Sequence, residues 1–151
     1  MGQAQSLATE VEIQAEPAAV RSVFMDFPRY KEWSSWTIEP IDAGKKPSDL
    51  KVDDKLKVNL KGMAFRPVVT ENSADCFSWE GSLYGLFVGK HEFFFRPSKK
   101  NPGGTTMVQA ESIHGAGAFM MRPQWSFRQQ TLDNWDGFFT ELKKEVEKSP
   151  S

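Results

Sequence analysis

The chain has 151 residues with 19 basic and 20 acidic side chains, a formal net charge of −1. This balance argues against general electrostatic attraction to nucleic acid or to anionic membranes. Its length is most simply that of one domain, and we expect residues 1–151 to form a single unit with an ordered core of about residues 7–148. Aromatic residues make up 13% of the chain, which predicts a bulky core or a cavity lined with rings.

Cysteine content and targeting signals bear on where the protein works. Cys76 is the only cysteine, so no internal disulfide can form, which is typical of a reducing compartment. We expect its side chain to point outward or pack locally, not to serve as a nucleophile. No stretch resembles a membrane span or a secretory signal, so we expect a cytoplasmic protein without stable membrane insertion. Gly2 and Ser6 match the short N-myristoylation pattern, and acylation of Gly2 is left open.

The first third of the chain predicts one strand and two short helices. Residues 7–14 alternate between apolar and polar side chains, the pattern of a half-buried strand. Pro17 then opens a helix over residues 17–26, because proline is tolerated at a first helical position. Beyond Pro28, residues 29–36 are expected to form a second short helix that carries Tyr30, Trp33 and Trp36.

Residues 54–114 predict consecutive antiparallel strands. The segments 54–61, 64–71, 76–83, 89–96 and 105–114 all have strand character. Pro67 marks an edge or a bulge in the second of them, since proline cannot donate a ladder hydrogen bond. We expect about six antiparallel strands after the first one, which predicts a curved antiparallel sheet of about seven strands.

The two longest strands form a predicted hairpin centred near Asn101, in a joint rich in proline and glycine. That register pairs Phe95 with Met107, Phe93 with Gln109, and His91 with Glu111. All six side chains share the more apolar face, with Ile113 beyond them. The His91–Glu111 pair has two interpretations. It is either a proton relay inside an aromatic wall, or a structural pair in which each buried polar group meets the other's need for a hydrogen-bond partner.

The C-terminal part predicts a connection and a long helix. Residues 115–121 are glycine-rich and apolar, so they form either a plain linker or a cavity mouth in which Phe119 and Met120 touch a ligand. Residues 124–148 have an apolar stripe at helical spacing that includes Trp135 and Phe138. Thr131 and Asn134 interrupt this stripe, either to bond a ligand or as accommodated core residues.

This order of elements resembles the helix-grip fold of the SRPBCC superfamily, which includes START lipid-transfer domains, pathogenesis-related plant allergens and aromatic polyketide cyclases. Several motifs support the resemblance. Residues 13–20 are similar to I-x-A-x-P-x-x-V, residues 26–33 to D-F-x-x-Y-x-x-W, residues 79–81 to W-x-G, residues 85–95 to G-L-x-x-G-x-H-x-F-x-F, and residues 104–115 to G-T-x-x-x-Q-x-E-x-x-x-G. The small polyketide cyclase/dehydrase-like branch is the most similar. The resemblance implies an α+β fold, a sheet wrapped around the long C-terminal helix, and an internal cavity.

The resemblance and the residues together suggest three functions. The first is a cofactor-free biosynthetic enzyme, a lyase or an isomerase, that cyclises, dehydrates or isomerises a hydrophobic carbonyl-bearing polyketide or terpenoid. Proton transfer would then pass through His91 and Glu111. The second is a non-catalytic carrier or transfer protein for a hydrophobic, lipid-like ligand. The third is a protein-interaction module, which predicts no sizeable cavity.

The predicted partner is therefore a hydrophobic small molecule, and a homodimer is left open. We expect no nucleic-acid partner, no cofactor and no metal site, because the two histidines lie on opposite strand faces and the cysteine is remote. We expect His91 and Glu111 to be the catalytic pair. The residues predicted to bind substrate are Trp33, Trp36, Trp79, Phe93, Phe95, Gln109, Ile113, Phe119, Met120, Thr131, Asn134, Trp135 and Phe138.

Overall fold

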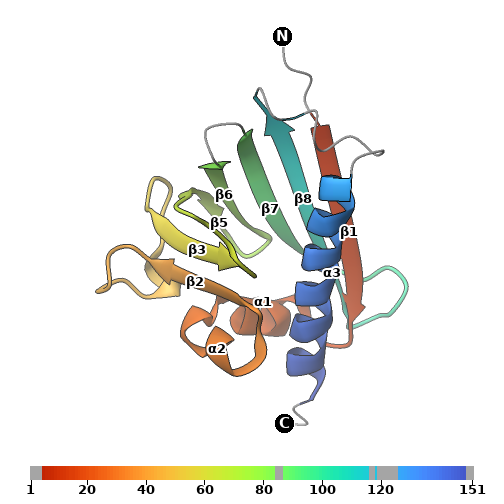
Figure 1. Cartoon of the computed structure of the whole chain (residues 1–151). Coiled ribbons are helices and arrows are strands. Elements are labelled where there is room, and N and C mark those ends of the chain that lie inside the picture. Colours follow the sequence, from red (N-terminus) through yellow and green to blue (C-terminus); the bar gives the residue numbers. More distant parts are fainter. Residues whose placement is uncertain (1–4, 84–86, 116–117, 119–125, 149–151) are drawn as a thin grey trace.

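Two antiparallel sheets form the body of the molecule (Figure 1). The computed structural model describes residues 5–83, 87–115, 118 and 126–148. In the five-stranded sheet the spatial order is β1 (Gln5–Ile13), β8 (Thr105–His114), β7 (Phe87–Pro97), β6 (Cys76–Leu83) and β5 (Val68–Asn72). In the three-stranded sheet the order is β2 (Trp36–Pro40), β3 (Leu56–Leu60) and β4 (Met63–Phe65).

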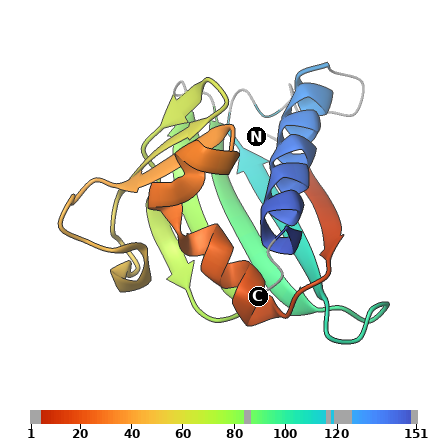
Figure 2. The same cartoon turned by 90° about the horizontal axis from the view of Figure 1, so that it is seen from below.

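The α-helices lie on one side of the large sheet (Figure 2). They are α1 (Pro17–Met25), α2 (Tyr30–Trp33) and α3 (Ser126–Glu147), and the 3-10 turns are η1 (Phe27–Arg29) and η2 (Pro47–Asp49). Figure 2 shows α3 along one flank and α2 with the small sheet along the other, while β7 and β8 pass behind and between them. This is the predicted helix-grip arrangement of a curved antiparallel sheet around a long C-terminal helix.

A cluster of buried aromatic rings fills the part of this enclosure that α1 covers. The Phe24 ring packs against those of Phe93 and Phe138, at centroid distances of 4.7 and 6.2 Å. Trp36 stacks on Phe138 at 3.9 Å with an interplanar angle of 4°. Packed rings of this kind contribute large apolar areas and favourable edge and stacking contacts. This end of the enclosure is therefore solid core.

The β7–β8 hairpin has the predicted register. His91 pairs with Glu111, Phe93 with Gln109, and Phe95 with Met107. All of these residues except Glu111 are at most 1% exposed, so the face that carries them is the inner one. The turn chemistry around Asn101 and the apolar pattern of the strands were sufficient to predict this pairing.

Two boundaries differ from the sequence prediction. Trp36 does not end the second helix: α2 stops at Trp33 and Trp36 begins β2. The expected strand over 64–71 is two strands in different sheets, with Pro67 between them. The carbonyl of Pro67 accepts a hydrogen bond from the backbone N–H of Leu56 (2.9 Å). Because proline has no N–H to donate, the chain leaves one sheet there and enters the other.

Cys76 lies on the outer face of β6, as expected, yet it is buried and only 3% exposed. Burial, with smaller contributions from Glu71 and Glu92, raises the pKa of its thiol to about 12. A thiol with so high a pKa stays protonated at neutral pH and is a poor nucleophile.

Candidate functional site

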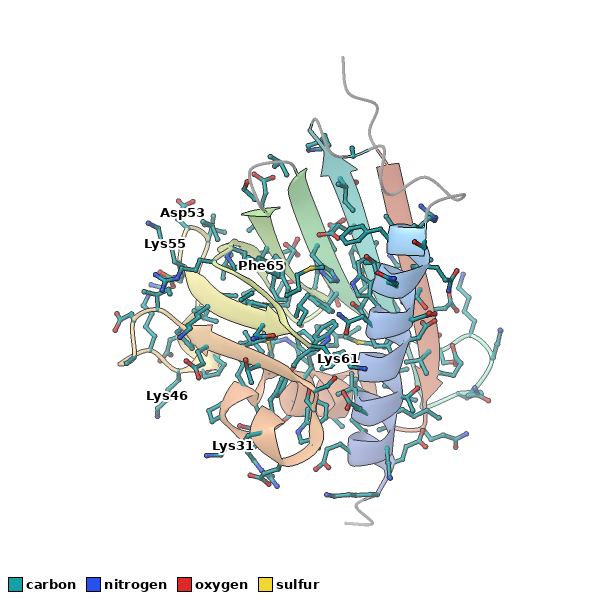
Figure 3. All side chains as sticks on the ribbon, viewed as in Figure 1. Lys31, Lys46, Asp53, Lys55, Lys61 and Phe65 are labelled. Carbon is teal, nitrogen blue, oxygen red and sulfur yellow. The ribbon has the colours of Figure 1, made fainter. Side chains whose placement is uncertain are left out.

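A pocket of about 400 Å³ lies between α3, the β3–β4 hairpin and strands β6 to β8. This volume is within the range of small-molecule sites. In Figure 3 Lys61, at the β3–β4 turn, lies beside the middle of α3, and Lys61 is part of the pocket wall. The pocket occupies the end of the enclosure that the aromatic core leaves open.

A pair of glycines forms part of the pocket wall. Gly81 on β6 pairs with Gly89 on β7, and both line the pocket. Gly81 lies on the same face as Trp79, and Gly89 on the same face as His91, because alternate strand residues share a face. The inner surface of the sheet therefore lacks two adjacent side chains here, and the Phe65 ring and Pro67 pack against Gly81 while the Glu111 carboxyl group lies against Gly89.

Glu111 is the unpaired acid in this pocket. It lies on β8, between His91 on β7 and Leu7 on β1. A Cβ on Gly89 would lie 2.7 Å from the Glu111 carboxyl oxygen, so the missing side chain makes room for this carboxyl group. Glu111 is half-buried and has no hydrogen-bond or ion-pair partner among the described residues. Burial raises the pKa of Glu111 to about 7, so protonated and ionised forms coexist near neutral pH.

His91 is buried and neutral. Its Nε2 lies 2.9 Å from Gln109 Oε1, while Gln109 Nε2 donates to the backbone carbonyl of Trp135 (3.3 Å). Because the amide nitrogen faces Trp135, its oxygen faces His91, so Nε2 of His91 carries the proton and Nδ1 is the acceptor. Burial outweighs the hydrogen bond to Gln109 and lowers the pKa of His91 to about 3.

The hydrogen bond of His91 therefore goes to Gln109 and not to Glu111. The two residues are cross-strand neighbours, as predicted, but no hydrogen bond joins their side chains. The interpretation in which they satisfy each other's polar groups is contradicted. What remains is a neutral imidazole held by an amide, next to a carboxyl group that has no partner.

The predicted binding residues divide into a pocket wall and a core. The wall contains Trp79, Ile113, Thr131, Asn134 and Trp135 in addition to His91 and Glu111. The core contains Trp36, Phe93, Phe95, Gln109 and Phe138, each at most 1% exposed and outside the pocket wall. Trp33 is half-buried and packs on Tyr30 and Phe138. Phe119 and Met120 lie outside the described residues.

Thr131 and Asn134 use their hydrogen bonds within the protein. The Thr131 hydroxyl donates to the Phe127 carbonyl (2.9 Å). Asn134 accepts a hydrogen bond from Trp36 Nε1 (2.8 Å) and donates one to the Leu60 carbonyl (2.9 Å). Asn134 thus ties α3 to both β2 and β3, and it holds the small sheet over the pocket.

Replacing Asn134 with alanine is expected to loosen this connection. The change leaves the buried Trp36 N–H without its acceptor, which costs about 1–3 kcal/mol. We expect urea unfolding to show a loss of that size in Asn134→Ala, against little change in Lys144→Ala, an exposed site on the same helix. Equal stability of the two variants would show that Asn134 does not hold the small sheet in place.

Several residues of the pocket wall were not predicted from the sequence. On the β3–β4 side these are Leu60, Lys61, Met63 and Phe65, and elsewhere they are Gly81, Ser82, Gly89, Phe127, Gln130 and Asp133. One signal was present in the sequence: Gly81 and Gly89 stand at positions where the strand pattern calls for large inward side chains. The residues of the β3–β4 hairpin carried no such signal. Their place over the pocket depends on the point, at Pro67, where the chain passes from the small sheet to the large one.

The pH dependence of stability tests the state of Glu111. Its carboxyl group has an ordinary pKa of 4.5 and a folded-state pKa of about 7. The folded protein therefore holds a proton that the unfolded chain releases between these pH values, and the associated stability is lost as the pH rises through 7. The unfolding free energy of wild type minus that of Glu111→Gln should fall by up to about 3 kcal/mol between about pH 4.5 and about pH 8.

This difference isolates Glu111 from the other titrating groups. The lowered pKa of His91 makes stability rise with pH from about 3 to 6.5, but it does so in both proteins and cancels. Urea unfolding at several pH values measures the difference. A difference that does not change with pH would mean that Glu111 titrates as an ordinary surface acid.

Two further features concern metals and membranes. Among the residues that the structure describes, no group of three or more His, Cys, Asp and Glu side chains is placed to hold a metal ion. Within the same residues, no helix combines the length and apolar character needed to cross a membrane.

Comparisons with known proteins establish the fold. No protein-family model and no curated protein matches the sequence. Solved structures do match, among them the hypothetical protein jhp0584 from Helicobacter pylori, with a TM-score of 0.75 at 12% identity over 95% of this chain and 88% of that one. Norcoclaurine synthase from Thalictrum flavum matches with a TM-score of 0.69 at 10% identity, over 99% and 90%. The Zhui aromatase/cyclase from Streptomyces sp. R1128 matches at 0.67 and 13% identity, over 96% and 94%.

The latter two neighbours, together with Ara h 8.0201 (TM-score 0.67, 13% identity, 97% and 100% covered), belong to the SRPBCC superfamily. This chain therefore has the helix-grip fold of that superfamily, as its sequence motifs predicted. At these identities the likeness concerns the fold, and function has to be argued from the pocket.

Proposed function

We propose that this protein binds a hydrophobic, carbonyl-bearing small molecule in the pocket and moves a proton on it through Glu111. The observation that carries the proposal is an unpaired carboxyl group, with a pKa near neutrality, on the wall of a pocket of about 400 Å³ that aromatic and aliphatic side chains line together with polar ones. A general acid–base group works best when its pKa is close to the working pH. Polyketide- or terpenoid-like carbonyl compounds fit such a site.

The chemistry needs only Glu111 and the bound ligand. The ionised carboxylate takes a proton from the carbon next to a carbonyl group, which leaves an enolate and a protonated Glu111. The protonated acid then returns the proton to another carbon, which isomerises the ligand, or gives it to a departing hydroxyl group, which completes a dehydration. In a cyclisation, the enolate carbon attacks a second carbonyl group and Glu111 protonates the new alkoxide.

His91 supports this chemistry without exchanging protons. With a pKa of about 3 it stays neutral near neutral pH, so it adds no charge beside Glu111 that would lower the pKa of that carboxyl group. Its ring also stacks on Phe93 at 4.4 Å, which holds it in place. We therefore assign proton transfer to Glu111 alone, with His91 as a neutral neighbour that is held in place.

A carrier without chemistry is the second candidate, because the same pocket would serve it. A pocket of this size disfavours the third candidate, an interaction module without a sizeable cavity. The two remaining functions differ in what happens to a bound ketone. A carrier leaves the protons next to the carbonyl group unchanged, whereas the proposed enzyme exchanges them with water.

Deuterium exchange into 2-tetralone, a bicyclic ketone, tests the proposal. Proton NMR in D₂O follows loss of the signals from the carbons next to the carbonyl group, and chemical-shift titration shows whether the ketone binds. Binding with exchange well above the buffer rate supports the enzyme. Binding with exchange at the buffer rate contradicts the catalytic part and leaves the carrier.

A further inference from the structure

Trp79 carries the one buried side-chain nitrogen or oxygen atom, among the described residues, that has no hydrogen-bond partner. This atom is the indole Nε1, and Trp79 is only 1% exposed. An indole N–H can only donate, and leaving such a buried donor unpaired is costly. Buried polar groups without a partner are uncommon in folded proteins and call for an explanation.

The neighbours of Trp79 place this residue at the pocket wall. Trp79 lines the pocket on β6 and pairs across the strands with His91, which in turn pairs with Glu111. The next residue on the same face of β6 is Gly81, which has no side chain. Gly81 also lines the pocket, and the Phe65 ring and Pro67 pack against it. The indole ring also contacts Phe65 and Phe93, which offer no acceptor, and His91 at a centroid distance of 5.2 Å, but no hydrogen bond joins the indole N–H to His91.

The other polar groups of the pocket wall leave few donors for a ligand, apart from the Trp135 indole, whose N–H makes no hydrogen bond to the described residues. The Thr131 hydroxyl and the Asn134 amide donate within the protein. His91 donates from Nε2 to Gln109, so its Nδ1 can only accept. Lys61, Ser82 and Gln130 are exposed. Glu111 can donate when protonated, but it lies two strands away from Trp79.

We infer that Trp79 determines ligand specificity, and that its Nε1–H donates to an uncharged oxygen acceptor of the ligand, such as a ketone oxygen. The inference rests on the proposed function and adds to it the group that recognises the carbonyl. Among the described wall residues the one positively charged side chain is that of Lys61, which is exposed to solvent, so an anionic oxygen at the buried indole would have no buried counter-charge. An uncharged oxygen satisfies the indole without that cost.

Two naphthalenes of similar shape test this assignment. The compound 2-acetylnaphthalene carries a ketone oxygen, and 2-isopropylnaphthalene replaces that oxygen with a methyl group. We expect wild type to bind the ketone roughly threefold to tenfold more tightly, the range for one neutral hydrogen bond. In Trp79→Phe the preference should disappear while the hydrocarbon still binds. An unchanged preference in Trp79→Phe would overturn the assignment.

A second measurement uses wild type alone and does not depend on the folding of the variant. The indole proton of Trp79 is identified by NMR through its contacts with the rings of His91 and Phe93. Its resonance should move downfield with the ketone and not with the hydrocarbon; an equal response to both overturns the assignment. If both compounds bind equally well, the assignment alone is wrong. If neither compound binds, the proposed binding of hydrophobic carbonyl compounds is wrong, and the assignment of Trp79 is wrong as well.

Discussion

Glu111→Gln is expected to abolish most deuterium exchange into bound 2-tetralone while the ketone still binds. The substitution keeps the shape of the side chain but removes the group that accepts and returns a proton. Loss of a positioned acid–base group lowers rates by roughly 10²- to 10⁴-fold. The dissociation constant of 2-tetralone should change only a few-fold, because the amide occupies the same space beside Gly89. Exchange and affinity are both measured by NMR on the same samples.

The matched control for this variant is Glu80→Gln. Glu80 lies on β6 with its side chain exposed to solvent, so the same chemical change is made outside the pocket. Exchange by Glu80→Gln should equal that of wild type. If Glu111→Gln also keeps wild-type exchange while 2-tetralone is bound, proton transfer does not depend on this carboxyl group.

Gly81→Leu is expected to block the pocket. Even a Cβ at this position would lie 3.2 Å from Pro67 and 3.3 Å from the Phe65 ring, so a leucine must push into the pocket or displace its wall. Overpacking of this kind costs about 1–3 kcal/mol. If that cost falls on ligand binding, the affinity for 2-tetralone drops by roughly 5-fold to 150-fold.

Glu80→Leu provides the control, because it adds the same side chain to the outer face of the same strand. Calorimetry of both variants with 2-tetralone measures the affinities, and urea unfolding shows that each remains folded. Wild-type affinity in a folded Gly81→Leu protein would mean that the ketone binds elsewhere and that this pocket is not the site.

The β7–β8 hairpin shows which features could be predicted from the sequence. The turn residues around Asn101 set the register, and strand alternation placed His91, Phe93 and Phe95 on the inner face. The apolar stripe of α3 and the start of α1 at a proline could equally be predicted from the sequence. These features depend on local periodicity and on short-range turn chemistry, which a single sequence carries.

The hydrogen bond of His91 could not be predicted in this way. Glu111 lies directly opposite His91, and Gln109 lies on the same face two residues along β8, so both are neighbours of the imidazole. The Trp135 carbonyl on α3 holds the nitrogen end of the Gln109 amide, which turns its oxygen toward His91. The choice therefore depends on a contact with a helix far away in the sequence.

The small sheet was not predicted either, because it also depends on contacts between segments that are far apart in the sequence. β2 is short and follows aromatic residues at helical spacing, so Trp36 was assigned to the preceding helix. Its place is set by tertiary contacts, namely the stack on Phe138 and the hydrogen bond to Asn134. The β3–β4 residues became part of the pocket wall only because this sheet packs against α3.

A direct titration of the Glu111 carboxyl group tests the central claim about this pocket. Carbon-13 NMR of labelled glutamate side chains, with Glu111→Gln used to identify the resonance, gives the pKa of that one group. The structure predicts a pKa of about 7, because burial disfavours the ionised form and no partner offsets it. A pKa near 4.5, the ordinary value for glutamate, would contradict the acid–base role proposed for Glu111.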